Sequence, residues 1–384
     1  VSVLTVGPAN PAYTMFGHTA IRLEDPLNRI DRVYNYGTFD FKAPGFFFKF
    51  LYGNLDYYLS AAPFEQFKQA NVELGRSIVS QSLDLSRSQI NELTQTLERS
   101  RKPENRSYRY RFFSQNCVTQ VVDLLSAEGV GPPTGQIQAM AISGATYRQK
   151  LGTYLNSRPW MQLGINLMLG SGADQRLSNE QQIFLPNALH LALANTTKAS
   201  GGWLVASDKT IATAINRGAH STLPPSLVFW MIYLLITALT ITSLLQGWQS
   251  LWIDRLLFGA AGLLGVIMAI GAFISLHEPL HNNWNLLWAL PTHLLVAGGL
   301  GVANTKWLRY YFWLTLLLYT VVLASWAVIP QQLPAAAIPL ICSLMVRSAY
   351  RLFDITIGLR ERRLRRKRPP SATENDKLLT ATRP

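Results

Sequence analysis

The chain has almost no cysteine. Its 384 residues include two, Cys117 in a polar region and Cys342 inside an apolar one. Two such separated cysteines exclude a disulfide framework of the kind that holds small secreted domains together. Acidic residues are also few, 22 against 35 Lys+Arg, so the net charge is +13. Charges become rare after about residue 225, where long apolar segments exclude an ordinary soluble domain.

The positive charge is unevenly distributed. Residues 1–221 contain 21 Lys+Arg against 16 Asp+Glu. Most of the remaining excess lies in residues 360–368, directly after the last apolar segment. A basic cluster in that place is typical of a cytoplasmic anchor and not of a nucleic-acid-binding surface. We therefore expect no nucleic-acid partner.

Five apolar segments are candidates for crossing a membrane: 226–245, 256–276, 284–302, 310–329 and 333–353. The third is interrupted by Pro291, and the fifth carries Arg347 and Arg351, which are expected to snorkel toward an interface. Four glycines of the second segment indicate close helix packing: Gly259, Gly262, Gly265 and Gly271.

Loop charges predict the orientation. Arg255 lies in the first connection, and Lys306 and Arg309 lie in the third. The second and fourth connections contain no Lys or Arg. Because basic residues stay on the cytoplasmic side, the tail is expected inside the cell. Five crossings then place the N-terminal half outside.

The N-terminal half has the pattern of a mixed α+β domain. Alternating apolar and polar residues in 19–23 and 33–41, around a turn at 25–28, predict a β-hairpin, and 77–85 predicts a third strand. Ser86 and Gln89 form a capping box before a helix. Residues 179–193 look partly helical, and 196–220 resembles a polar connection. The chain opens without methionine on strand-like residues, which leaves a removed signal peptide and a trimmed start as alternatives.

A cysteine at a helix start and a histidine on a strand are the parts of a thiol nucleophile. Asn116 or Ser114 is expected to cap a helix with Cys117 in its first turn, where N–H groups and the helix dipole favour a thiolate. His18 is the expected base. Asn35 is the first choice for holding its imidazole, and Asp40 is the second. The alternative is that Cys117 is a small buried apolar residue.

Residues 277–281 match the zinc-protease pattern H-E-x-x-H, but Pro279 would break the helix that this site requires. We therefore expect no metal. The same residues belong to an outer loop, 276–288, whose polar side chains could bind a lipid headgroup or satisfy helix ends. These side chains are His277, His281, Asn283 and Asn285.

Several motifs together resemble the Lnb-type lipoprotein N-acyltransferases. They are residues 16–20, 33–41, 102–106, 108–110, 116–117, 159–160, 164–165, 184–186 and 283–288. The histidine-before-cysteine order also resembles circularly permuted papain-like acyltransferases, in which a helix-borne cysteine packs on a small antiparallel sheet. The chain departs from the family pattern in Val118-Thr119-Gln120 after the cysteine and in Arg111, where an acidic residue is expected.

The resemblance implies an α+β, permuted papain-like thiol domain followed by a bundle of about five transmembrane helices. The expected divisions are a catalytic domain, 1–150, an extracytoplasmic helical extension, 151–222, a transmembrane domain, 223–355, and a basic cytoplasmic tail, 356–384. The implied location is the bacterial inner membrane, with the catalytic domain in the periplasm. A monomer is expected.

The implied reaction moves an acyl chain from the diacylglyceryl group of a lipoprotein to the α-amine of its N-terminal cysteine. Cys117 carries the chain as a thioester, and a lyso-lipoprotein results without any cofactor. Lipoproteins and the phospholipid surface are the expected partners. Asn116, Tyr36 and Asp40 are the expected substrate contacts besides the outer loop. Two other classes stay open: a membrane-tethered cysteine peptidase or amidase, and a non-enzymatic sensor or scaffold.

Overall fold

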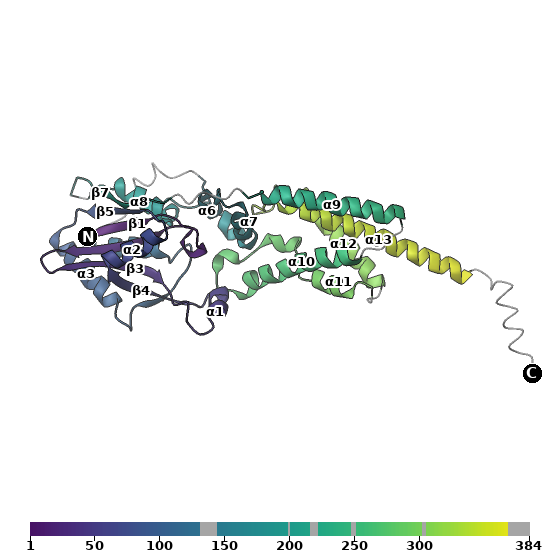
Figure 1. Cartoon of the computed structure of the whole chain (residues 1–384), viewed down its shortest axis with the longest axis horizontal. Coiled ribbons are helices and arrows are strands. Elements are labelled where there is room, and N and C mark those ends of the chain that lie inside the picture. Colours follow the sequence, from purple (N-terminus) through teal and green to yellow (C-terminus); the bar gives the residue numbers. More distant parts are fainter. Residues whose placement is uncertain (131–143, 199, 216–221, 247–250, 302–304, 368–384) are drawn as a thin grey trace, which may run out of the picture. The chain divides into compact units, whose positions relative to one another are not determined.

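The computed structural model describes residues 1–130, 144–198, 200–215, 222–246, 251–301 and 305–367 (Figure 1). These residues form two compact units. The first contains 1–224, 267–284 and 330–333, and the second contains 225–266, 285–329 and 334–384. The predicted α+β class is confirmed, with an antiparallel sheet in the first unit and helices in the second. The outer loop predicted from the sequence is largely part of the first unit.

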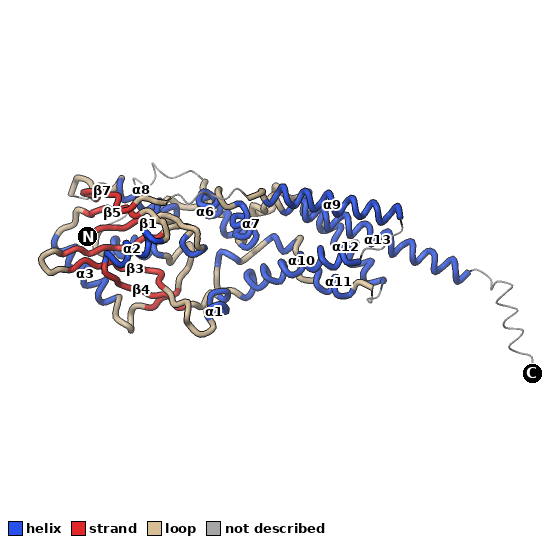
Figure 2. Tube along the Cα trace, in the orientation of Figure 1, coloured by secondary structure: helices blue, strands red, loops and turns tan. Residues whose placement is uncertain are grey.

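Seven antiparallel strands form one sheet in the order β6-β4-β3-β2-β1-β5-β7 (Figure 2). They are β1 (Ser2–Val6), β2 (His18–Asp25), β3 (Ile30–Thr38), β4 (Asp56–Pro63), β5 (Ile78–Leu83), β6 (Ser107–Arg109) and β7 (Val205–Ala212). The predicted hairpin is β2–β3, and the predicted third strand is β5. The expectation of a polar connection over 196–220 is wrong in part, because β7 lies within it and pairs with β5. As an edge strand with mostly polar exposed residues, β7 lacks the apolar alternation that marks a strand.

Alternate strand residues pack on opposite faces of the sheet, as the pleat requires. Val3 and Ile21 contact α3 (Arg87–Ser100) and α4 (Cys117–Ala127) in the main core, which also includes α8 (Pro186–Ala194). Leu4 and Ala20 pack on the other face with α2 (Phe64–Glu73). The predicted capping box at the start of α3 is present. The sheet therefore carries the cysteine-bearing helix on one face.

The rest of the first unit consists of short helices. They are η1 (Ala12–Thr14), α1 (Phe46–Tyr52), α6 (Tyr147–Leu155), α7 (Pro159–Met168), η2 (Ser171–Asp174), η3 (Glu180–Ile183), η4 (Ile270–Ile274) and η5 (Glu278–Leu280). The stretch 179–193, predicted to be partly helical, contains η3 and α8. The close approach of Gly170 to the outer loop leaves no room for a side chain, since a Cβ atom there would lie 1.7 Å from the carbonyl oxygen of His281.

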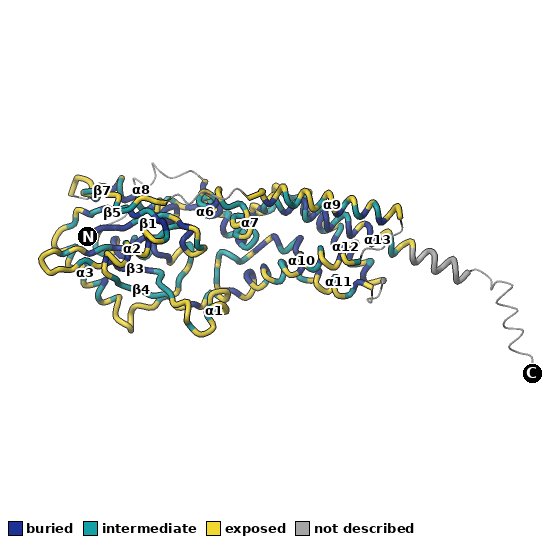
Figure 3. Tube along the Cα trace, viewed as in Figure 1, coloured by how far each residue is buried: buried dark blue, intermediate teal, exposed yellow. Residues whose placement is uncertain are grey.

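The second unit contains α9 (Pro225–Gln246), α10 (Leu251–Ala269), α11 (His293–Gly299), α12 (Thr305–Ala324) and α13 (Ala337–Lys367), with η6 (Trp284–Leu287) at its border. In the described part of the chain, three helices are long and apolar enough to cross a membrane: Pro225–Gln246, Leu251–Ile274 and Lys306–Ala324. Large apolar side chains stay exposed along them, as α9 shows in Figure 3. They coincide with the first, second and fourth predicted segments. The third predicted segment, 284–302, contains only the short α11, which begins after Pro291. The fifth predicted segment, 333–353, contains the first half of α13.

Close packing at the glycines of α10 is confirmed. A Cβ atom on Gly262 would lie 2.6 Å from the backbone nitrogen of Leu294, and one on Gly265 would lie 2.1 Å from the carbonyl oxygen of Ala289. These contacts let the segment around α11 lie directly against α10.

The prediction that Arg347 and Arg351 snorkel is wrong. Both are buried and share the carboxylate of Asp254 in α10, with Arg347 Nη2 2.9 Å and Arg351 Nε 2.6 Å from its Oδ2. Arg347 Nη1 also donates to Thr240 Oγ1 in α9 at 2.9 Å. A partner 93 residues away in sequence satisfies the charge inside the bundle, so these arginines join three helices.

We expect Asp254→Asn to destabilise the bundle, because it leaves two buried guanidinium groups without an anion. Removing one partner from a buried ion pair costs about 3–5 kcal/mol. The measurement is thermal unfolding of the full chain in detergent. Arg255→Gln, the control, removes the exposed charge next in sequence and is expected to cost about 1 kcal/mol or less. Equal melting temperatures for the two variants would contradict a stabilising role for the cluster.

Candidate functional site

Cys117 is the first residue of α4, and Asn116 fixes its position. Asn116 Oδ1 accepts the N–H groups of Val118 at 2.8 Å and Thr119 at 3.0 Å, which caps the helix. Its Nδ2 donates to the carbonyl oxygens of Phe112 and Phe184. The oxygen and the nitrogen of this buried side-chain amide are therefore both hydrogen-bonded to backbone groups. Its expected contact with substrate stays a prediction.

The expected contact between His18 and Asn35 is present. His18 begins β2, and its Nε2 lies 3.2 Å from Oδ1 of Asn35 on the neighbouring strand β3. An amide oxygen only accepts, so Nε2 carries the proton and Nδ1 keeps its lone pair. The backbone N–H of Thr19, the residue after His18, lies near the Cys117 sulfur and lowers the pKa of the thiol. The structure thus brings the three predicted catalytic residues to one end of β2, while their catalytic roles stay predictions.

Asp40, the alternative partner for His18, lies beyond the end of β3. It is exposed, and its carboxylate accepts the backbone N–H of Lys42 at 2.8 Å. The imidazole of His18 donates to Asn35, so the geometry favours Asn35 over Asp40 as the residue that holds the ring.

The resting thiol differs from the expected thiolate. Burial raises the pKa of Cys117 above its ordinary value. The N–H groups at the helix start and the charge of Arg76 lower that pKa only in part. Burial, and then the charge of Arg76, lowers the pKa of His18 to about 4. Because desolvation outweighs the helix dipole here, thiol and imidazole are both neutral at neutral pH.

Arg76 is a site residue that the sequence did not reveal. It lies in the connection between α2 and β5, and its side chain is buried. Its Nε donates to the carbonyl oxygen of Gly7 at 2.8 Å, and its Nη1 donates to Asn71 Oδ1 at 2.9 Å. Nη2 is buried and has no hydrogen-bond partner among the described residues. Its charge favours a thiolate at Cys117 and disfavours a proton on His18. A single arginine after a loop glycine carries no sequence signal of this role.

Tyr110 is the second residue that was missed. Its hydroxyl lies near the backbone N–H of Cys117, and its ring stacks on Tyr57 with centroids 4.5 Å apart. Tyr108 and Tyr110 alternate around β6, which is the pattern that could have indicated a shared face. Tyr36, an expected substrate contact, is buried in the core cluster that contains Cys117 and meets the ring of Tyr108 edge-on.

The outer-loop side chains bind backbone carbonyl groups. His277 Nε2 lies 2.7 Å from the oxygen of Phe50, and His281 Nε2 lies 2.8 Å from that of Ser275. Asn283 Nδ2 donates to the oxygens of Leu167 and Met168. Asn285 belongs to the second unit, where its oxygen accepts the indole N–H of Trp288. These contacts agree with the alternative in which the loop satisfies helix ends, and headgroup binding stays a prediction.

The same loop explains a departure from the family pattern. Arg111 pairs with Glu278 at 2.8 Å, so the unexpected basic residue meets a carboxylate of the loop. Around it, residues 278–280 form a short 3-10 turn and not an α-helix, as Pro279 predicts. The two loop histidines are therefore not one helical turn apart on an α-helical face.

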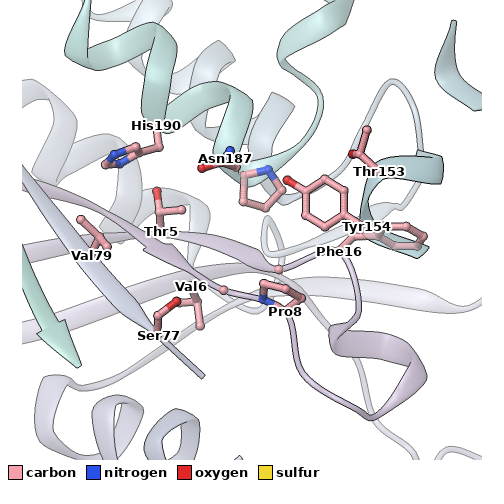
Figure 4. Close-up of a pocket in the computed structure, with 13 residues that line it drawn as sticks. Thr5, Val6, Pro8, Phe16, Ser77, Val79, Thr153, Tyr154, Asn187 and His190 are labelled. Atoms are coloured by element: carbon pink, nitrogen blue, oxygen red, sulfur yellow. The ribbon is translucent and has the colours of Figure 1, made fainter. Parts of the chain in front are cut away.

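A cavity of about 400 Å³ opens beside Gly17, the residue before His18 (Figure 4). Thr5 Oγ1 and His190 Nδ1, both at its wall, have no hydrogen-bond partner in the described part of the chain. Its other labelled side chains include Phe16, Ser77, Tyr154 and Asn187. The lining includes none of the predicted catalytic residues, so the cavity adjoins the thiol site without containing it.

Comparison with known families agrees with this architecture. The model of the Lnb N-terminal periplasmic domain matches residues 1–149, and the model of the Lnb transmembrane domain matches residues 217–357. No curated protein and no solved structure matches the chain. Cys117, His18 and Asn35 all lie in the periplasmic match. With both parts matched, the chain belongs to the Lnb family and is an inner-membrane protein with a periplasmic N-terminal domain.

Proposed function

We propose that this protein is a lipoprotein N-acyltransferase that uses Cys117 as its nucleophile. One observation carries the proposal: Cys117 begins α4 with its sulfur near the backbone of Thr19, the residue that follows His18 of the His18–Asn35 pair, in a periplasmic domain joined to membrane spans. The proposed donor is the glyceryl ester of a lipoprotein, and the proposed acceptor is the α-amine of its N-terminal cysteine.

The first step forms a thioester. His18 Nδ1 takes the thiol proton as the sulfur attacks the ester carbonyl, because both groups are neutral at rest. The carbon–oxygen bond of the ester then breaks, and the imidazolium returns the proton to the departing glyceryl oxygen. Asn35 holds the ring through Nε2 in this step. Arg76 disfavours a long-lived imidazolium and so promotes the return of the proton.

The negative oxygen that forms on the carbonyl carbon needs donors at the helix start. Asn116 already occupies the N–H groups of Val118 and Thr119. The hydroxyl of Tyr110 lies next to the N–H of Cys117 and keeps its own proton, so it is the proposed donor.

The second step transfers the chain. The lipoprotein amine attacks the thioester carbonyl, His18 removes the amine proton, and the thiol is regenerated with that proton. The product is an N-acylated lyso-lipoprotein, and atoms and charges balance without another reactant. Water in place of the amine would make the same site a hydrolase.

The product can be identified by mass spectrometry of a lipoprotein N-terminus from cells that express the chain. We expect one N-linked and one glyceryl-linked acyl chain with the native protein, and a free amine with both glyceryl chains in Cys117→Ser. Serine is a far weaker nucleophile with this base. Cys342→Ser serves as the control and should retain activity. Near-normal N-acylation by Cys117→Ser would remove the thiol from the mechanism, and an N-acylated product with two glyceryl chains would identify another lipid as donor.

The pH dependence of alkylation and of acylation by the purified protein tests whether the Cys117 thiol and the His18 imidazole are both neutral at neutral pH. Alkylation of Cys117 should accelerate as pH rises through and above the ordinary thiol value of 9.0, because its pKa is raised. Formation of the Cys117 thioester, which does not need a deprotonated acceptor amine, should persist in mild acid and fall as pH drops through about 4, where His18 becomes protonated. Arg76→Gln removes a charge that lowers the pKa of His18, so the acid limb should move upward by about one pH unit. An acid limb already centred near 6.5 in the native protein would contradict this account.

We also propose that the basic C-terminal tail lies in the cytoplasm, on the charge asymmetry of the connecting loops. A reporter that is active only in the periplasm, fused after Pro384, should be silent. The same reporter inserted after Leu27, in the exposed turn between β2 and β3 of the full-length chain, provides the active control. Activity of the full-length fusion would mean an even number of crossings.

A further inference from the structure

The helix α1 exposes an unusual amount of apolar surface. Its seven residues are Phe46–Tyr52, and only Lys49 is charged. None of them is buried, and Phe47 and Phe48 are 63% and 76% exposed. So short a helix has little stability of its own, and Gly45 and Gly53, both with positive φ, end it on either side. A contiguous apolar face of this kind marks a surface that contacts something other than water.

Three contacts tie the C-terminal end of α1 to one short segment. Ser275 Oγ donates to the oxygen of Leu51 at 2.9 Å, and the N–H of Leu276 donates to that of Tyr52 at 2.7 Å. His277 Nε2 contacts the oxygen of Phe50. The carbonyl groups of Leu51 and Tyr52 would otherwise lack partners at the helix end, whereas that of Phe50 also accepts the N–H of Gly53 at 3.1 Å.

That segment follows directly on a membrane span. Ile274 is the last residue of the apolar helix Leu251–Ile274, which is long enough to cross a bilayer. Phe273 and Ile274 are 80% and 57% exposed, as lipid-facing residues are. Residues 275–277 are therefore the point at which the chain leaves the hydrocarbon region, and α1 is fastened there.

A row of aromatic rings continues from α1 toward the thiol. Neighbouring ring centroids lie 6.1, 6.0, 5.3 and 4.5 Å apart. In order, the row consists of Phe50, Phe46, Phe39, Tyr57 and Tyr110. At its end, the hydroxyl of Tyr110 meets the N–H of Cys117. All these residues lie in the first unit.

We propose that α1 is an interfacial helix that inserts Phe47, Phe48 and Leu51 into the periplasmic leaflet, and that the aromatic row presents a membrane-held acyl ester to Cys117. The bilayer is the chosen partner because the exposed apolar helix is hydrogen-bonded to Ser275, the residue that directly follows a candidate membrane span. Lys42 and Lys49 lie at or beside the helix, as suits the headgroup level. Delivery of the ester rests on the proposed function, whereas insertion of the helix does not.

Insertion can be measured without any activity. The full chain, with Cys117→Ser and Cys342→Ser, receives a nitroxide label at Phe48→Cys and is reconstituted into phosphatidylethanolamine–phosphatidylglycerol vesicles. We expect the label to collide more with oxygen than with a water-soluble nickel complex. The control is Leu27→Cys, at a turn residue that is 94% exposed, where nickel should dominate. Equal nickel accessibility at positions 48 and 27 would overturn the proposal.

Delivery is tested with Phe47→Ser combined with Phe48→Ser in the otherwise native chain. We expect acylation to fall about tenfold, the effect of about 1.4 kcal/mol in the barrier. The rate of Cys117 alkylation should not change, because neither side chain belongs to the aromatic row that reaches the thiol and both are already exposed. Leu27→Ser is the matched control and should keep full activity. Undiminished acylation by the double variant would overturn the delivery role, and an inserted label with an inactive native chain would instead count against the proposed function.

Discussion

The whole site depends on the way in which Asn116 holds the start of α4. Its oxygen caps the helix and its nitrogen fastens the preceding and following loops, at Phe112 and Phe184. This places the Cys117 sulfur against the backbone of β2, beside His18. The same cap occupies the N–H groups of Val118 and Thr119, which leaves the Tyr110 hydroxyl as the proposed donor to a reacting carbonyl. One amide thus sets both the position of the proposed nucleophile and the groups left free around it.

Electrostatics gives this site a different resting state from an ion-paired thiol enzyme. Burial disfavours charge on both Cys117 and His18, and Arg76 acts on the two in opposite directions. A neutral pair suits a nucleophile that is activated only when an ester is in place, because proton transfer then accompanies attack. It also protects a periplasmic thiol, since the reactive form in oxidation is the thiolate. Reactivity and protection therefore follow from the same desolvation.

The sequence predicted those features that depend on local pattern. Strand alternation located β2, β3 and β5, cap residues located α3 and α4, and glycine spacing predicted the close approach at Gly262 and Gly265. What it could not predict depends on distant partners. From the sequence, Arg347 is predicted to snorkel, because the sequence does not show that Asp254 lies beside it in the folded bundle. Arg76 is recognised as a site residue only from the structure, in which its buried Nη2 lies near the thiol without a hydrogen-bond partner among the described residues. The edge strand β7 was missed because its neighbour β5, and not its own pattern, defines it.

The first unit is assembled from three separate segments of the chain, and this affects the order in which it can fold during synthesis. Its three pieces, 1–224, 267–284 and 330–333, are separated in the chain by segments of the second unit. Gln331 in the last piece donates to the oxygen of Leu169 at 2.9 Å and contacts Asn283 at 3.3 Å. Domains generally fold in the order in which the ribosome delivers them, but this one cannot be completed until later membrane segments have been translated. Completion of the first unit is thereby coupled to synthesis of the membrane segments, and a chain released before residues 330–333 are made would lack part of this unit.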